Sequence, residues 1–133
     1  MTDQQCGIHP SLEADVFNRD CPSRTVVQNI GGRWGTLALV ALHDGPHRFG
    51  VLRRHVDGVS ERMLSQTLQS LEHDGLVHRT VLEAIPPKVE YSLTEFGTEV
   101  AERLHGLIEL VESRLPDVLE ARANYARKNT PAQ

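Results

Sequence analysis

The stretch Ser60–Gly97 decides the fold predicted for this chain, and it reads SERMLSQTLQSLEHDGLVHRTVLEAIPPKVEYSLTEFG. Ser60 is a favourable residue at the start of a helix, and Gly75 is the residue expected at a left-handed helix end. Two strand-like runs follow, Val77–Leu82 and Val89–Leu93, and a second helix begins after them. The stretch therefore predicts a helix, a β-hairpin and a helix, in that order.

Capping residues such as Ser11, together with apolar spacing, predict further helices on both sides of this stretch. Helix, hairpin and helix, preceded by a shorter helix and a three-residue turn, is the order of a winged helix-turn-helix. The chain is thus expected to be mainly α with a small β-hairpin. The other predicted helices are Leu12–Asn18, Pro22–Ile30, Arg33–His43, Phe49–Val56, a long helix from Thr94 to Leu115 and, after Pro116, Asp117–Tyr125.

The composition predicts one globular domain. The chain has 133 residues, of which 39% are hydrophobic and 24% charged. The sequence shows no run that suggests a membrane span and no secretory signal, and a count of two cysteines fits a cytoplasmic protein. The net charge is −4, which argues against nucleic acid, but residues 31–93 hold seven Arg and Lys against seven Asp and Glu. Local clustering of these basic residues would decide whether phosphate can bind.

The polar face of the helix after Ser60 carries side chains of the kind that read DNA bases. In the major groove Arg pairs with guanine, Gln pairs with adenine, and Ser contacts bases or phosphate. An ordinary solvated face is the alternative, although such a face more often carries Glu and Lys. The DNA-binding residues predicted on this helix are Ser60, Arg62, Ser65, Gln66 and Gln69.

Basic residues outside that helix are predicted to contact the DNA backbone. Arg79 and Lys88 flank a proline-stiffened loop, whose tip can follow phosphates or enter a minor groove. Arg48, Arg53 and Arg54, near the short helix, are candidate phosphate clamps. The alternatives are a plain hairpin packed on the core and ordinary surface arginines.

Cys21 stands at a helix start, where the positive end of the helix dipole favours a thiolate. It is therefore a candidate redox sensor, since oxidation would add a charge or a crosslink between subunits. A small buried apolar residue is the alternative interpretation of Cys21. Cys6, in the N-terminal arm, is a candidate resolving thiol.

No metal, cofactor or catalytic site is predicted. A zinc site made by Cys6, His9 and Cys21 would lack a firm fourth ligand. His43 and His47 are separated by a Gly-Pro turn, which prevents a shared helix face. The sequence has no phosphate-binding Gly loop, nucleophile elbow or paired buried carboxylates, so it indicates a protein that is not an enzyme and needs no cofactor.

Several motifs, taken in order, resemble the HxlR-type winged helix-turn-helix regulators of bacteria, which are distant relatives of the MarR type. Each fragment is weak alone, but their order and spacing over roughly residues 21–110 are highly specific. The matching pieces are Cys21-Pro22, Ile30 to Trp34, Gly45 to Phe49, Leu52 to Arg54, Gly58 to Leu64, Leu71 to Val77, Pro86 to Thr94 and Gly97.

The resemblance implies a homodimer that binds a two-fold operator on double-stranded DNA. In this family the first and last helices form the dimer interface. Here they correspond to residues 1–20, an arm and short helix, and to residues 94–133, a C-terminal dimerisation helix and tail. The DNA-binding core would occupy residues 21–93. Several family members sense oxidants through a cysteine at the Cys-Pro position, a role that falls on Cys21.

Three hypotheses follow. The first is a dimeric, sequence-specific transcriptional regulator, a repressor, whose operator affinity falls when Cys21 is modified. The second keeps the DNA-binding role but places control in a small apolar effector at the dimer interface. The third is a winged helix that binds proteins and no DNA, which the net charge of −4 motivates.

Overall fold

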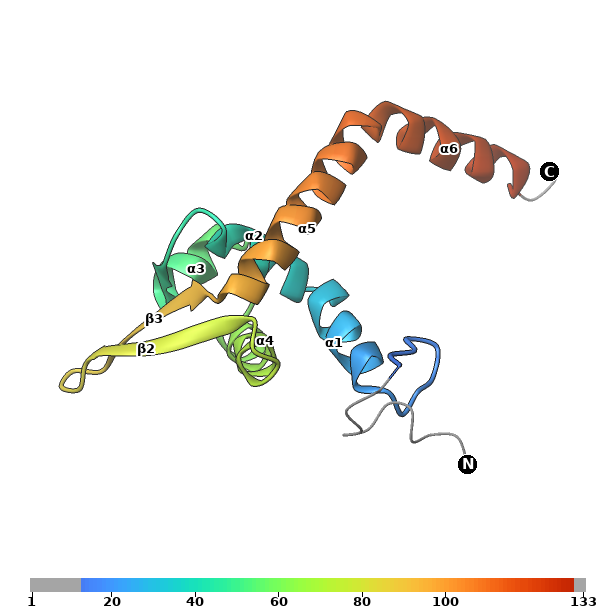
Figure 1. The fold of residues 1–133 in the computed structure, drawn as a ribbon. Helices are drawn as coiled ribbons and strands as arrows, with labels where there is room; N and C mark the ends of the chain where they lie inside the picture. Colours follow the sequence, from blue (N-terminus) through green and yellow to red (C-terminus); the bar gives the residue numbers. More distant parts are fainter. Residues whose placement is uncertain (1–12, 131–133) are drawn as a thin grey trace.

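The computed structural model describes residues 13–130 and has the predicted winged helix-turn-helix fold (Figure 1). It is mainly helical with a small antiparallel sheet, which confirms the predicted fold class. The described elements are α1 (Pro22–Gly31), α2 (Gly35–Leu42), β1 (His47–Arg48), α3 (Phe49–His55), α4 (Glu61–His73), β2 (Val77–Glu83), β3 (Lys88–Leu93), α5 (Glu95–Ser113) and α6 (Leu115–Lys128).

Helix α2 lies at the centre of the hydrophobic core. Its sequence, GTLALVAL, has no charged face, and such a helix is stable only when neighbours cover it on most sides. Helices α1, α3, α4 and α5 and strand β3 all pack against α2. The core holds these elements in fixed positions around α2, and its largest fully buried side chains include Leu39, Leu42, Leu52, Leu64, Leu68, Leu71 and Leu76.

Helix α4 has the ends and the buried face that the sequence predicts. The Ser60 hydroxyl accepts a hydrogen bond from the Met63 N–H at 3.1 Å, so Ser60 is the N-cap. Gly75 has a φ of +80°, a left-handed conformation that ends the helix and that glycine adopts without strain. The apolar side chains that seat the helix on the core are Leu64, Leu68 and Leu71.

The hairpin predicted after α4 forms two strands of a three-stranded sheet with the order β1-β3-β2. β2 pairs antiparallel with β3, and Val77 lies opposite Leu93 at its base. β1 pairs with the other edge of β3, where Arg48 lies opposite Glu90. Two residues are too few to show an alternating pattern, so sequence reasoning missed β1. This strand holds the start of α3 against the wing, the name used below for β2, β3 and their connecting loop.

The helix predicted over Leu12–Asn18 is wrong for the described residues, which form turns and bends before α1. The Asp15 carboxylate accepts a hydrogen bond from the Phe17 N–H at 3.0 Å, and the Asn18 side chain accepts one from the Asp20 N–H at 2.9 Å. Short polar side chains that bond nearby backbone in this way compete with helix formation. These bonds therefore favour turns over the predicted helix in this segment.

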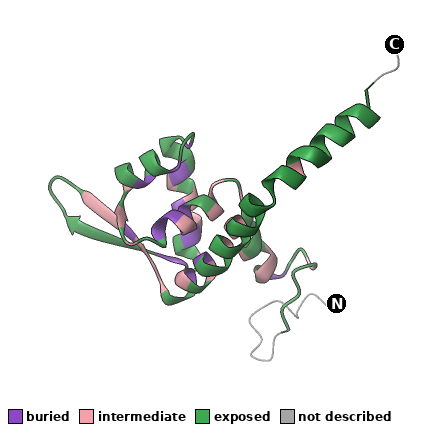
Figure 2. Cartoon of the chain, turned by 90° about the horizontal axis from the view of Figure 1, so that it is seen from above, coloured by how far each residue is buried: buried purple, intermediate pink, exposed green. Residues whose placement is uncertain are grey.

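The C-terminal helices lead away from the core. The Thr94 hydroxyl accepts a hydrogen bond from the Gly97 N–H at 2.9 Å and caps α5, as predicted. α6 begins at Leu115, earlier than predicted, because Pro116 fits the first turn of a helix. Figures 1 and 2 show α6 projecting from the body, and none of its residues is buried. Within residues 13–130, no helix has the length and apolar character needed to span a membrane.

Candidate nucleic-acid interface

Helix α4 presents a polar face on the side opposite its buried leucines. Arg62, Gln66 and Gln69 are exposed, and Ser65 is half-buried. Within residues 13–130, none of these four side chains has a hydrogen-bond or ion-pair partner. Their donors and acceptors are therefore available to an external partner. Ser60 is also exposed, but its oxygen is engaged as the cap, which leaves its O–H available to donate.

The turn between α3 and α4 fixes the direction of this face. Val56 and Val59, at the two ends of the turn, are buried. Leu52 of α3 is completely buried as well, and α3 packs directly on α2. Two helices joined by such a short, anchored turn form a helix-turn-helix, in which the second helix carries the outward polar side chains.

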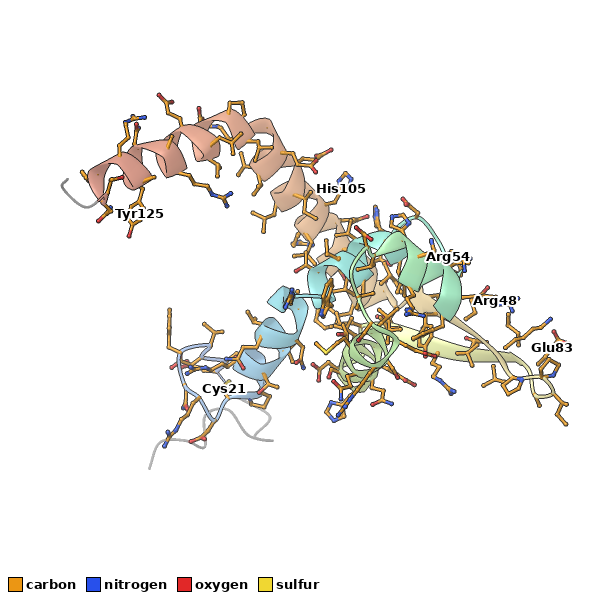
Figure 3. All side chains as sticks on the ribbon, turned by 180° about the vertical axis from the view of Figure 1, so that it is seen from behind. Cys21, Arg48, Arg54, Glu83, His105 and Tyr125 are labelled. Carbon is orange, nitrogen blue, oxygen red and sulfur yellow. The ribbon has the colours of Figure 1, made fainter. Side chains whose placement is uncertain are left out.

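The predicted phosphate-binding arginines are exposed and carry no carboxylate partner within the part of the chain that the structure describes. An unpaired guanidinium keeps its full charge and its fork of donors for an external anion. Figure 3 shows Arg54 and Arg48 following one another from α3 toward the wing tip, where Glu83 lies. The exposed arginines of this region are Arg48, Arg53, Arg54, Arg62 and Arg79.

Lys88 differs from these arginines because it is paired within the chain. Its Nζ lies 2.9 Å from Oε1 of Glu83, on the facing strand of the wing. The loop beyond this pair is apolar, and Ile85 is 91% exposed. The wing tip is therefore close to neutral, and the attraction of phosphate to this region depends on the neighbouring arginines.

The structure brings Arg48 and Lys88 together, which the sequence did not predict. Both line a shallow cavity of about 280 Å³ between the start of α3 and the wing. The cause is β1, whose pairing with β3 places Arg48 at the wing base. Two residues predicted to act separately, one beside the short helix and one on the hairpin, thus form one basic corner.

Cys21 lies at the N-cap position of α1 and is only 1% exposed. Its sulfur is 3.1 Å from the Ser23 hydroxyl and accepts a contact from the Asp15 N–H at 3.4 Å. Cys21 is disulfide-bonded in this structure, and Cys6 lies outside the described residues. Figure 3 shows Cys21 at the opposite end of the molecule from Glu83 and the wing tip.

Comparison with known proteins places this arrangement in a family. A family model described as HxlR-like helix-turn-helix matches residues 29–118, from the end of α1 into the start of α6. The chain belongs to the HxlR-like family. The match includes α5 and the whole helix-turn-helix and wing, and the last two carry the polar face and the basic corner.

Several known regulators are similar to this chain over most of their own length. The HTH-type transcriptional regulator YtfH of Escherichia coli (strain K12) is 49% identical over 114 residues, 86% of this chain and 90% of the relative. The solved structure of the ytfH regulator from Salmonella typhimurium has a TM-score of 0.78 and 49% identity, covering 84% of this chain and 99% of that one. The redox regulator HypR in its reduced form has a TM-score of 0.66 and 42% identity, covering 75% and 98%. This HxlR-like chain is a transcriptional regulator with a helix-turn-helix domain.

Sequence reasoning missed a second cavity of this HxlR-like regulator, which borders the polar face of α4. It has a volume of about 240 Å³ and lies between the α1–α2 junction and α4, with Trp34 and Gln66 in its lining. The Arg33 guanidinium lies over the Trp34 ring, 5.1 Å from its centroid. Among the described residues, the buried indole N–H of Trp34 has no hydrogen-bond partner. The run Ile30 to Trp34 contributed to the family resemblance, but its spacing gave no sign of a cavity.

Some of the residues considered as metal ligands lie inside residues 13–130, and others lie outside them. His9 and Cys6 lie outside residues 13–130. Inside that range no group of three or more His, Cys, Asp or Glu side chains is arranged to hold a metal ion.

Proposed function

We propose that this HxlR-like regulator is a homodimeric repressor that binds a two-fold DNA operator with α4 in the major groove. The observation that carries the proposal is the outward face of α4, where Arg62, Ser65, Gln66 and Gln69 have no partners in residues 13–130 and the exposed carboxylates, Glu61 and Glu72, lie in the first and last turns. A helix entering the major groove needs such a face, because Glu or Asp there would repel the phosphates that flank the groove.

Each proposed contact follows from side-chain chemistry. Arg62 would bind guanine, Gln66 and Gln69 would bind adenine, and Ser65 a base or phosphate. Arg53 and Arg54 extend from the last turn of α3 and would bind phosphates beside the groove. The remaining proposed backbone contacts come from the basic corner, from Arg79 and from the Ser60 hydroxyl.

The homodimer is proposed from the apolar residues of α5 and α6 that the core leaves uncovered. Leu107, Leu110 and Val111 of α5 are about half exposed, and α6 contributes no buried residue. An apolar stripe along a projecting helix is typical of a surface that another chain covers. The described residues before α1 form turns and offer no helix to such an interface. We therefore assign most of the dimer interface to α5 and α6 and a smaller part to residues 1–20.

We further propose that oxidation of Cys21 controls operator affinity, with Cys6 as the resolving thiol. The fold of the chain is similar to that of HypR, which is described as a redox regulator. Two donors, the Asp15 N–H and the Ser23 hydroxyl, lie at the Cys21 sulfur and would stabilise its thiolate after reduction. α1, whose first residue follows Cys21, packs on both α2 and α4, which gives a route to the polar face.

The DNA-binding proposal is tested by a mobility-shift assay on the DNA upstream of the chain's own gene. Arg62→Ala and Gln66→Ala should each weaken operator binding by about 1–3 kcal/mol and change non-specific binding little. Arg122→Ala removes an equal charge from α6 and serves as the control, with the dimer checked by size-exclusion chromatography. Equal losses from Arg122→Ala and Arg62→Ala would contradict base reading, and no DNA binding by the wild type would favour a protein-binding module.

The redox proposal is tested with Cys21→Ser, assayed with and without diamide. The wild type should lose operator affinity on oxidation and regain it with a thiol reductant, whereas the variant should not respond. Mass spectrometry of the oxidised protein distinguishes a Cys6–Cys21 bond within one chain from one between subunits. Equal responses of the two proteins would remove Cys21 from the mechanism.

A further inference from the structure

A cavity of about 420 Å³ lies between α2, the end of α3 and α5, away from the polar face of α4. Its size falls within the range of about 300–1,000 Å³ that is typical of small-molecule sites. Its walls are apolar and come from all three helices. The wall residues are Leu37, Val40 and Ala41 of α2, Val56 after α3 and Ile108 of α5.

The rim of this cavity is polar and carries one sign of formal charge. Asp44, Asp57, His55 and His105 line it, and the lining includes no Lys or Arg. Within residues 13–130, neither aspartate carboxylate has a hydrogen-bond or ion-pair partner. With histidine counted as neutral, the rim therefore contributes two negative charges to an apolar cavity.

Each of the two rim histidines has another imidazole beside it. The His55 ring lies 6.2 Å from the His47 ring, and the His105 ring lies 6.1 Å from the His43 ring. Nδ1 of His105 is also 3.7 Å from Oε2 of Glu109. The imidazoles thus add polar edges to the cavity, while the two aspartates provide its unpaired charge.

We propose that this cavity binds a small organic cation with an apolar body, such as an aryl- or alkylammonium ion. The apolar body would displace water from the walls, and the ammonium head would meet the two unpaired carboxylates. An anion of the same shape would meet only negative charge at the rim. A neutral molecule would gain the apolar contacts but not the charge.

The cavity opens on a different side of α5 from the proposed dimer stripe. His105 is two residues before Leu107, which corresponds to a rotation of roughly 200° around the helix. Leu107 belongs to the half-exposed apolar stripe, whereas His105 lines the cavity. A second copy of the chain on that stripe would therefore leave the cavity open.

The cavity is also placed to influence α4, an inference that rests on the proposed DNA-binding function. Val56 and Asp57 line the cavity and belong to the turn that leads to Ser60, the cap of α4. Ile108 belongs to α5, the helix proposed to join two copies. A ligand that contacts both would favour one angle between α4 and α5, and so would change operator affinity.

The binding test uses calorimetric titration of the full chain with three probes of similar shape. These are 2-phenylethylammonium, 2-phenylethanol and 3-phenylpropanoate. The ammonium ion should bind roughly tenfold more tightly than the alcohol, and the carboxylate most weakly. Equal binding of the ammonium ion and the alcohol, or no binding of the ammonium ion, would overturn the proposal.

Variants then assign the binding to this cavity. The double variant Asp44→Asn with Asp57→Asn should abolish the preference for the ammonium ion and leave the affinity for the alcohol unchanged. Leu37→Ser should weaken the binding of both the ammonium ion and the alcohol, since it alters only the apolar wall. Glu120→Gln, on α6, is the control and should bind all three probes as the wild type does. A preference that survives the double variant would place the site elsewhere.

The proposed effect of the ligand on operator affinity is measured in the mobility-shift assay. Saturating 2-phenylethylammonium should change the operator Kd of the wild type and not that of the double variant. An unchanged Kd in the wild type would overturn the coupling. If the chain binds no operator at all, the proposed function is wrong and the coupling with it, while the calorimetric result still decides whether the cavity is a binding site.

Discussion

Asn29 of α1 donates a hydrogen bond from its Nδ2 to Oδ2 of Asp74, at the end of α4, over 2.8 Å. The Asp74 side chain is only 9% exposed, and its other oxygen lies 3.0 Å from Nδ1 of His73. This bond joins residues 45 positions apart and ties the last turn of α4 to α1. The direction of the polar face therefore depends on a contact at the end of the helix far from Ser60.

Asn29→Ala should destabilise the protein by about 1–3 kcal/mol. The substitution removes the donor and leaves a nearly buried carboxylate without that partner, which costs part of its desolvation energy. Urea unfolding followed by circular dichroism measures the effect. Gln28→Ala, at the exposed neighbouring position, should change stability by less than about 0.5 kcal/mol, and an equal loss in both variants would contradict this role for Asn29.

Gly97→Ala should destabilise the protein by about 1–3 kcal/mol. A β-carbon at position 97 would overlap the carbonyl oxygen of Leu76, so α5 or the base of the wing would have to move. Gly106→Ala, in the same helix, is a matched control because a β-carbon there meets nothing within 4 Å. That control should be stabilised by roughly 0.5–1 kcal/mol, since alanine favours helix. Thermal unfolding that ranks the two variants in the opposite order would refute the close approach.

Ser60→Ala should cost about 1 kcal/mol of stability through loss of the cap on α4. Ser60→Asn keeps a capping side chain, so its stability in urea unfolding should match that of the wild type. Comparing the operator affinities of the two variants then separates capping from contact with DNA. A weaker operator complex in Ser60→Asn at full stability would assign a phosphate contact to the serine hydroxyl, whereas equal stability of all three proteins would exclude the capping role.

Glu83→Gln should strengthen DNA binding, because it releases Lys88 from its ion pair in the wing. The additional cation should make the dependence of log Kd on log salt steeper by roughly 0.9. Mobility-shift or fluorescence titrations at several salt concentrations measure this slope. Glu112→Gln removes a carboxylate from α5 and is the control. An identical slope in the wild type and Glu83→Gln would mean that the wing does not approach the phosphates.

The elements predicted correctly from sequence are those whose signals are local. The cap at Ser60, the leucine spacing of α4 and the stop at Gly75 all lie within one stretch of chain, so a pattern of a few residues was sufficient. The same holds for Thr94 and α5.

The features that sequence reasoning missed depend on contacts between distant segments. β1 exists because β3 pairs with it, and the basic corner exists because β1 places Arg48 beside Lys88. The ion pair of Lys88 with Glu83 likewise depends on the bulged register of β2 and β3. The helix predicted before α1 is wrong, because a capping residue at its start does not reveal the bonds that Asp15 and Asn18 make to nearby backbone.

The start of α5 is hydrogen-bonded to the base of the wing, so a small tilt there moves the far end of the helix by a large distance. Thr94 donates its N–H to the carbonyl of Leu76 at 3.1 Å and its hydroxyl proton to the carbonyl of Gly75 at 2.7 Å, while also capping the helix. The 19 residues of α5 extend about 28 Å from this attachment. A tilt of roughly 10° there would displace the far end by about 5 Å, more than the 3.4 Å between successive base pairs. In the proposed dimer, a tilt of this size at the base of the wing would therefore be enough to spoil the match to an operator.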